Sequence, residues 1–381
     1  MTVQESVGGE GVRDVPVMED ILAQPPAVYA VGRTYRIMVP VRVETLCWCE
    51  VGGETFEDES CGILRSASLT HAVTVPMGTL DRAGGYTLCF RVVRQRKPYF
   101  SEVSDVVRLE VPFRPLPEGR IRLYMVADAH NRIASPVAAA GRPDLLVLNG
   151  DIPEDSGRLE NFTTIHAIAG QVTRGEVPTV FARGNHDLRG VCAERLAEHT
   201  PTQDGRSYYT FRLGTLWCIV LDCGEDKTDD HAEYGHTVCC HAFRRRETAF
   251  LREVVACAGE EYAAPGVTRR LVVCHVPFSQ VLEAPFDIEQ DTYREWCRLL
   301  REQVRPHLML CGHIHDLYVT LPGEGRDHLG QPCPVVVGSR PGPGPDRFIG
   351  TEVTLEPDGR AVVEFVDQDR ASHGRMTLEL K

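Results

Sequence analysis

Five apolar runs in this chain each end directly in side chains that can bind a metal ion. The side chains are carboxylates, imidazoles and one amide. In chain order they fall in the blocks Asp128-Ala129-His130, Gly150-Asp151, Gly184-Asn185-His186-Asp187, Cys274-His275 and Gly312-His313-Ile314-His315. The carboxyl ends of strands in open α/β sheets face the crevice where ligands bind, so we expect these five loops to converge on one site.

The residue types match the needs of a centre with two metal ions. Such a centre requires a bridging carboxylate, neutral imidazoles and other oxygen donors, with positions left open for water and substrate. Two cations about 3.5–4 Å apart clamp a phosphate and supply a hydroxide. The expected bridge is Asp151. The expected ligands are Asp128, His130 and His315 for one ion, and Asn185, His275 and His313 for the other.

The glycines in these blocks have a mechanical interpretation. Gly150, Gly184 and Gly312 each stand immediately before a candidate ligand, where a glycine lets the backbone turn sharply and approach the ions closely. We expect the segment from Gly312 to His315 to be extended. Residues two apart would then share one face, so that both imidazoles point into the cleft and Ile314 packs behind them.

His186 remains for proton transfer. Breaking a phosphorus–oxygen bond creates an alkoxide leaving group, which a histidine is suited to protonate near neutral pH. Asp187 beside it is expected to act with His186 by orienting the imidazole, or to hold the loop. Arg183 and Asn185 are the expected substrate-binding residues, with an ordinary surface salt bridge as the alternative for Arg183.

Each block alone is a weak signal. An isolated Asp-x-His or Gly-Asp is more often a turn than a metal site. All five blocks in order, each at the end of an apolar run, are very hard to explain as chance. In this order the blocks resemble the motifs of the calcineurin-like metallophosphoesterase superfamily, over roughly Ile121 to Arg340.

The resemblance implies a fold of four α/β/β/α layers with a dimetal site at one edge of the sandwich. It also implies the ligand roles given above, with His186 as the histidine close to the scissile phosphate. The function it supports is hydrolysis of a phosphomonoester or phosphodiester, with metal-bound hydroxide as nucleophile and His186 as general acid.

Two alternatives stay open. A nucleotide pyrophosphatase or cyclic-nucleotide phosphodiesterase would carry the same motifs, because the motifs hold the phosphoryl group and not the rest of the substrate. A binding protein that keeps the fold without catalysis is the alternative outside the enzymes, and the complete ligand blocks argue against it.

Residues from about Ala27 to Arg114 alternate short β-rich runs with turn signals, which predicts a small antiparallel sandwich of fibronectin-like or immunoglobulin-like size. A proline-rich segment at 112–119 is the expected linker. We predict a flexible extension at 1–24, the all-β sandwich at 25–115 and the α/β phosphoesterase domain at 116–381. The sandwich is interpreted as a substrate lid, a dimer surface or a spacer.

A β-sandwich ahead of such a domain resembles the layout of purple acid phosphatases, with two departures. Those enzymes place a metal-binding tyrosine three residues after the Gly-Asp aspartate, where this chain has Glu154, and they lack the first-block histidine, here His130. The iron-tyrosinate chromophore is therefore not expected. The resemblance implies a colourless enzyme that uses manganese, iron or zinc.

The acidic segment from Leu221 to His236 is interpreted either as a flap that shapes substrate choice or as a solvated loop. In the first case Asp222 would support the site from behind. Tyr234 and His236 are then the candidates for substrate contact.

Net charge indicates the class of partner, and the cysteines indicate the redox state of the protein. A net charge of −13 disfavours broad nucleic-acid binding, and a small phosphorylated substrate is the expected partner. The fourteen cysteines are expected to be reduced core thiols; the stretch Cys239–His241 lacks the paired Cys-x-x-Cys typical of zinc sites. With no signal peptide and no apolar run of about 18 residues, we expect a cytoplasmic protein without membrane attachment. Oligomeric state has no signal in the sequence.

Overall fold

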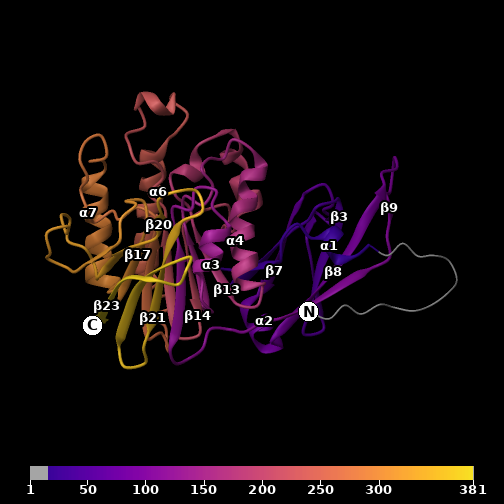
Figure 1. Cartoon of the computed structure of the whole chain (residues 1–381), viewed down its shortest axis with the longest axis horizontal. Coiled ribbons are helices and arrows are strands. Elements are labelled where there is room, and N and C mark those ends of the chain that lie inside the picture. Colours follow the sequence, from indigo (N-terminus) through magenta and orange to yellow (C-terminus); the bar gives the residue numbers. More distant parts are fainter. Residues whose placement is uncertain (1–15, 381) are drawn as a thin grey trace.

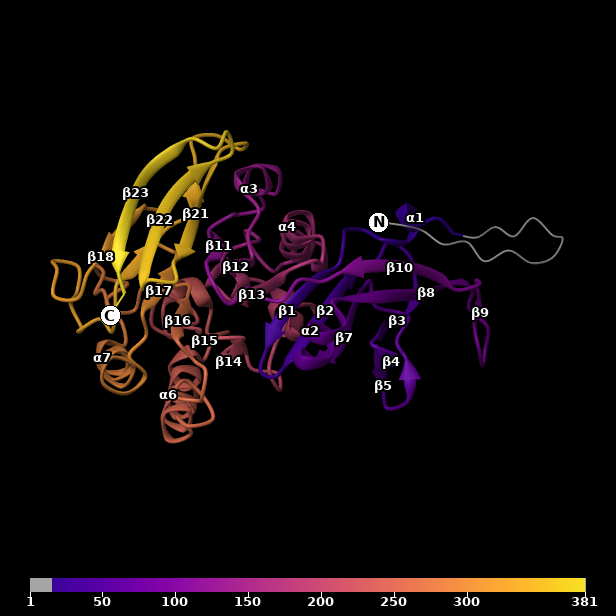
Figure 2. The ribbon, with the colours of Figure 1, turned by 90° about the horizontal axis from the view of Figure 1, so that it is seen from below.

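The computed structural model describes residues 16–380, in which two β-sheets pack face to face between layers of helices (Figures 1 and 2). Within this range ten strands form the first sheet and six form the second. The first sheet has the order β23 (Ser372–Glu379), β22 (Arg360–Asp367), β21 (Phe348–Leu355), β11 (Ile121–Val126), β12 (Leu145–Asn149), β13 (Pro178–Ala182), β1 (Ala27–Val31), β2 (Thr34–Pro40) and β7 (Thr70–Pro76), with β20 (Arg340–Pro341) beside β21. The second sheet has the order β14 (Tyr209–Leu213), β15 (Leu216–Leu221), β16 (Arg269–Cys274), β17 (Leu308–Cys311), β19 (Val335–Val337) and β18 (Tyr318–Thr320).

Helices cover the outer face of each sheet. Figure 2 shows α3 (Ala134–Ala139) and α4 (Thr163–Thr173) on one side of the two sheets, and α6 (Cys240–Ala256) and α7 (Gln290–Leu299) on the other. The remaining helices are short. They are α1 (Met18–Ile21), α2 (Met77–Ala83), η1 (Leu159–Phe162), η2 (His186–Leu188), η3 (Val191–Arg195), α5 (Leu196–His199), η4 (Ala232–Tyr234) and the π-helical turn η5 (Leu300–Val304). In the described part of the chain, no helix combines the length and apolar composition needed to cross a membrane.

Three apolar clusters separate the layers. Strands β12, β13 and β15 are buried along their whole length, as expected for parallel strands covered on both faces. Val147 and Val273 belong to the cluster between the sheets, Ile168 to the cluster under α4, and Trp296 to the cluster under α7. The predicted α/β/β/α layering is confirmed. All fourteen cysteines lie within residues 16–380 and are free, and ten of them are buried.

The N-terminal strands form a sandwich, and one of its two sheets is shared with the rest of the molecule. Figure 1 shows these strands at one end of the molecule. Its separate sheet has the order β10 (Val107–Pro112), β8 (Gly85–Gln95), β3 (Thr45–Val51) and β4 (Glu54–Glu57), with β9 (Glu102–Val103) beside β8, and β5 (Glu59–Ser60) pairs with β6 (Ile63–Leu64). Its other sheet is β1, β2 and β7, and β1 pairs in parallel with β13, so these strands extend the first sheet.

The predicted segment boundaries can be compared with this shared sheet. Residues 1–15 of the predicted extension lie outside the described residues, whereas Ile21 in α1 is fully buried. In the predicted linker, Phe113 and Leu116 are buried in the core that the sandwich shares with the two main sheets. The boundary at 115/116 therefore stays a prediction for experiment.

Residues 116–380 produced alone should be much less stable than the whole chain. Removing β1 uncovers an edge of β13 and the apolar side chains around it, and each large side chain newly exposed costs about 1.5–3 kcal/mol. We expect the midpoint of thermal unfolding, followed by circular dichroism, to fall by about 10 °C or more. A fragment that melts cooperatively within a few degrees of the whole chain would instead establish an independent domain.

Candidate metal centre

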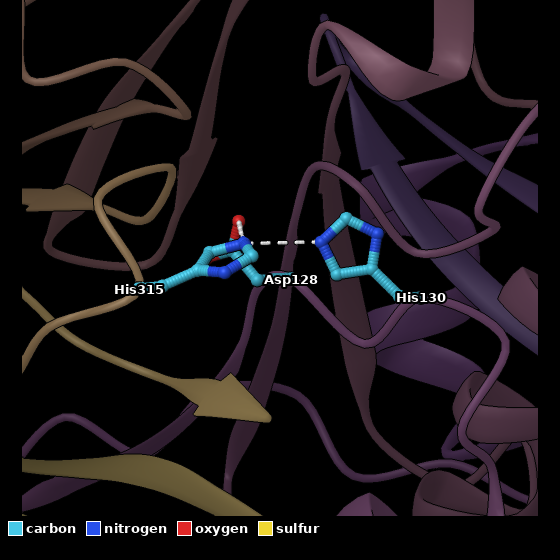
Figure 3. Close-up of side chains that lie close together, drawn as sticks. All are labelled: Asp128, His130 and His315. Atoms are coloured by element: carbon cyan, nitrogen blue, oxygen red, sulfur yellow. Dashed lines mark hydrogen bonds and ion pairs between the residues drawn. The ribbon is translucent and has the colours of Figure 1, made fainter. Parts of the chain in front are cut away.

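The predicted metal ligands and His186 lie together where the two sheets meet. The loops after β11, β12 and β13 of the first sheet carry Asp128, His130, Asp151, Asn185 and His186, and the loops after β16 and β17 of the second sheet carry His275, His313 and His315. Figure 3 shows the His315 side chain pointing toward Asp128 and His130, which belong to the loop after β11. The predicted convergence of five loops is thus found in the fold.

One group of donor atoms corresponds to the first predicted ion. Nε2 of His130 lies 3.1 Å from Nε2 of His315, which lies 3.2 Å from Oδ1 of Asp128 (Figure 3). Ligand atoms of these three residues all lie within 4.8 Å of one another. Such closeness of two imidazole nitrogens and a carboxylate oxygen suits a shared cation.

A second group corresponds to the second predicted ion. Asp151, His275 and His313 also have ligand atoms within 4.8 Å of one another. Nε2 of His275 lies 3.2 Å from Oδ2 of Asp151, and Nδ1 of His313 lies 3.0 Å from Oδ1 of Asn185. Nε2 of His275 is also 3.7 Å from Oδ1 of Asp128. His275 therefore lies between Asp151 of the second group and Asp128 of the first.

The second group of donor atoms is chemically suited to bind a cation. His275 uses Nδ1 to donate to the Asn149 carbonyl oxygen, and its buried Nε2 has no hydrogen-bond partner. Burial lowers the pKa of His275, but the facing carboxylates of Asp151 and Asp128 outweigh burial and raise this pKa to about 10. Burial and the neighbouring His275 lower the pKa of His313 to about 4, which keeps that imidazole neutral as a ligand must be.

The backbone at this site is unusual. Five predicted ligands have left-handed conformations, with φ of 55° at Asp128, 45° at His130, 53° at Asp151, 70° at His313 and 53° at His315. Such conformations cost side-chain-bearing residues about 1–3 kcal/mol each and cluster at functional sites. The expectation of an extended segment from Gly312 to His315 is therefore wrong. Both imidazoles reach the cleft from a turn, while Ile314 packs partly against the core under α6 and α7.

The glycines act mainly through close approach. Only Gly150 has a positive φ, of 80°, and a Cβ there would lie 2.6 Å from Nδ1 of His275. A Cβ on Gly312 would lie 2.7 Å from Oδ2 of Asp128, and one on Gly184 would collide with the carboxylate of Asp151. The predicted sharp turn is found at Gly150, and at all three glycines a Cβ would collide with neighbouring side chains of the site. The predicted close approach to the ions stays a prediction.

Backbone amides hold the carboxylates in place. His186 N–H donates to Oδ1 of Asp151 over 2.8 Å, and His313 N–H donates to Oδ2 of Asp128 over 3.0 Å. Asp187 is fully buried beneath them, where Oδ2 accepts from the backbone N–H groups of Gly184 and Asp151. Burial and the charge of Asp151 raise the pKa of Asp187 to about 7. Asp187 contacts backbone and not the His186 imidazole, so it takes the loop-holding role of its two predicted roles.

The imidazole of His186 has one defined tautomer. Nδ1 lies 2.7 Å from the Glu154 carbonyl oxygen, and Nε2 lies 3.0 Å from Nη1 of Arg189. An arginine has no acceptor, so Nε2 accepts from Arg189 and Nδ1 donates to the carbonyl oxygen. The ring centroid lies 4.7 Å from that of His130, which places His186 beside the first donor group.

Glu154 contributes more than its sequence position indicated. Its Oε2 lies 3.0 Å from Nδ1 of His130, whose Nε2 faces His315 and Asp128. Glu154, His130 and His186 also form the third group of potential ligands among the described residues. Burial lowers the pKa of His130, and the Glu154 carboxylate is among the nearby negative charges that oppose this shift. The sequence feature that could have pointed to Glu154 is its position three residues after Asp151, where purple acid phosphatases have a metal-binding tyrosine.

Arg183 forms a salt bridge, as in the alternative to substrate binding, but this salt bridge is largely buried and does not lie at the surface. Its Nε donates to Oδ2 of Asp222 over 2.7 Å, and its guanidinium lies 5.1 Å from the centroid of the Phe243 ring. The side chain is largely buried in this salt bridge and does not line the cleft. Asp222 thus lies behind the site as expected, with Arg183 as its partner.

The acidic segment forms part of a cleft of about 520 Å³. Asp226 and Lys227 line this cleft together with Leu282 and Phe286, which supports the flap interpretation. Tyr234 is buried behind it and donates to Oδ1 of Asp226 over 2.8 Å, so it supports the wall. His236 is exposed and does not line the cleft.

Comparison with known proteins agrees with this geometry. A family model described as calcineurin-like phosphoesterase matches residues 104–317, more than half of the 381-residue chain. The chain belongs to the calcineurin-like phosphoesterase family. Membership confirms the resemblance on which the sequence motifs were interpreted, and the family and fold indicate a dinuclear metal centre.

The solved structure of purple acid phosphatase PPD1 from seeds of yellow lupin (Lupinus luteus) is similar in fold. The match has a TM-score of 0.60 at 12% sequence identity and covers 93% of this chain and 74% of the lupin chain. At this identity the similarity concerns the fold, and it includes the N-terminal strands. A search of curated proteins gave no match.

Replacing Glu154 with glutamine should weaken metal binding. The amide keeps the shape of the side chain but removes the charge that makes His130 more basic, and loss of such a partner typically costs about 10- to 100-fold in affinity. Calorimetric titration of Mn²⁺ into metal-stripped protein measures this. Glu160→Gln, at an exposed position on η1, is the matched control. Equal affinity for both variants would contradict the role of Glu154.

Metal binding should release a proton and strengthen with rising pH. Without ions His275 is protonated below its pKa of about 10, and a cation can bind only to the neutral ring. Between pH 6 and pH 9 the apparent association constant should rise by about tenfold per pH unit for one displaced proton. Titrations of Mn²⁺ in buffers of different ionisation enthalpy count the released protons. A value of zero at pH 7 would show that His275 is already neutral.

Proposed function

We propose that this protein hydrolyses a phosphomonoester or phosphodiester with the help of two metal ions. The observation that carries the proposal is the meeting of two donor groups around the buried side chains of Asp128, Asp151 and His275. The proposed ligands are Asp128, His130, His315 and the bridging Asp151 for one ion, and Asp151, Asn185, His275 and His313 for the other. When bound, such ions supply positive charge to the phosphoryl oxygens and a nucleophile at neutral pH.

His186 is the proposed general acid. Its imidazole lines the cleft, and the Glu154 carbonyl oxygen and Arg189 fix the orientation of the ring. To protonate the leaving oxygen, the ring must carry a proton on Nε2, which now accepts from Arg189. The ring must therefore take up a proton from water to become imidazolium, and the hydrogen bond from Arg189 is released when it does. Asn185 also lines the cleft and is proposed to contact the substrate as well as the ion.

The cofactors proposed are manganese, iron or zinc ions. Imidazole and carboxylate donors suit these metals, and a glutamate in place of the tyrosine of purple acid phosphatases supports a colourless centre. The proposed partner is a small phosphorylated molecule, because a cleft of about 520 Å³ lies in the range of small-molecule sites.

Hydrolysis of p-nitrophenyl phosphate and of bis-p-nitrophenyl phosphate should depend on added metal. Stripped protein reloaded with Mn²⁺, Fe²⁺ or Zn²⁺ is assayed on both esters. We expect His186→Ala to lower kcat by about 10²- to 10⁴-fold, because general acid catalysis is lost while the ligands stay. Metal content measured in parallel should equal that of the unaltered protein.

His373→Ala, at an exposed histidine on β23 that pairs with Asp367, is the matched control and should keep full activity. Turnover at the unaltered rate in His186→Ala would sink the general-acid assignment. Turnover that persists in metal-stripped protein, or in Asp151→Asn, would contradict the proposal that the reaction depends on metal ions.

A further inference from the structure

Arg189 lies in the cleft with its guanidinium held in one orientation. Nε and Nη2 donate to the two carboxylate oxygens of Glu225 over 3.0 and 3.1 Å, and Glu225 is almost fully buried. A bidentate pair of this kind fixes the plane of the guanidinium as well as its position. The third nitrogen, Nη1, lies 3.0 Å from Nε2 of His186. A permanent positive charge is therefore fixed beside the proposed general acid.

One N–H group of Nη1 remains available to bind an anion. Nη1 carries two N–H groups, and within the described residues His186 accepts from one of them. An oxygen that enters the cleft next to His186 comes within reach of the other. Arg183 offers no such group, because Asp222 and Phe243 hold it behind the site. Arg189, unlike Arg183, lines the cleft.

The rest of the cleft wall limits how much negative charge can enter. Lys227 also lines the cleft, but Nζ is already shared between Asp226 and Glu233, each 3.0 Å away. Asp226 lines the cleft, and Glu225 and Glu233 pair with Arg189 and Lys227 from behind it, so three carboxylates face these two cations. A second phosphate group on this side of the cleft would approach the Asp226 carboxylate, with cations that are already paired, and like charges at close range repel.

Apolar side chains face the remaining space. Leu282, Phe286 and Ile314 line the same cleft, and Phe286 is 37% exposed although large and aromatic. An exposed aromatic ring beside a phosphate site suits an organic group that is itself aromatic or apolar.

We propose that Arg189 binds a non-bridging oxygen of the substrate's phosphoryl group, and that the substrates are esters of a single phosphoryl group with an aromatic or apolar alcohol. This inference rests on the proposed function and assigns a substrate class to the same site.

Binding of inorganic phosphate to the Mn²⁺-loaded protein tests the role of Arg189 without turnover. Arg189→Met should weaken phosphate binding by about 10- to 100-fold, as expected for loss of a charge-assisted hydrogen bond. Arg189→Lys keeps a charge beside Glu225 and should lose less. Calorimetry gives the dissociation constants, and circular dichroism melts of both variants establish that they fold.

Arg195→Met is the matched control, since Arg195 is an exposed arginine that pairs with Glu198 outside the cleft. It should bind phosphate like the unaltered protein. If both folded Arg189 variants also bind phosphate with unchanged affinity, the role of Arg189 is overturned even where the enzyme turns over esters. If phosphate binding depends on Arg189 but no ester is hydrolysed, the proposed function fails and the anion site stands.

Substrate class is tested with phenyl phosphate, glycerol phosphate and adenosine triphosphate. We expect kcat/KM for phenyl phosphate to exceed that for the other two, and Phe286→Ala to reduce this preference. Equal or better use of the triphosphate would overturn the single-phosphoryl class. Glycerol phosphate used as well as phenyl phosphate would overturn the role of the apolar wall.

Discussion

Two buried carboxylates, Asp128 and Asp151, impose the constraint on which the site depends. Both are almost fully removed from water, and a charge buried without a partner is very costly. Backbone amides of His186 and His313 satisfy one oxygen of each carboxylate, and His275 lies against both. Each compensating group comes from a different loop. The electrostatic requirement therefore orders loops from both sheets around one point.

The same loops carry backbone strain that the surrounding fold must sustain. Left-handed conformations at five proposed ligands cost about 1–3 kcal/mol each, a large sum beside a typical net stability of about 5–15 kcal/mol. The fully buried strands β12, β13 and β17, which lead into the site from both sheets, hold the ends of these loops in place. A cation bound between these loops would add its binding free energy to the stability of the fold.

Local sequence blocks indicated which side chains would meet, because every candidate ligand follows an apolar strand within one to four residues. Long-range features had no comparable signal. The parallel pairing of β1 with β13 joins Val28 to Pro178, and no pattern near either residue indicates its partner. Arg183 and Arg189 are six residues apart, and which one faces the cleft depends on whether Asp222 or Glu225 binds it. The turn at His313 and His315 likewise depends on contacts with Asp128, beyond the reach of local periodicity.

The shared sheet also bears on how this chain is synthesised. Strand β1 emerges from the ribosome about 150 residues before β13, its parallel neighbour. Through that interval one edge of β1 lacks its final partner, and unpaired apolar strand edges promote aggregation. The N-terminal strands consequently complete their structure only after the strand leading to Asn185 and His186 has been made. The sandwich and the metal-binding edge are therefore linked through β13, which is a neighbour of β1 and leads to Asn185 and His186.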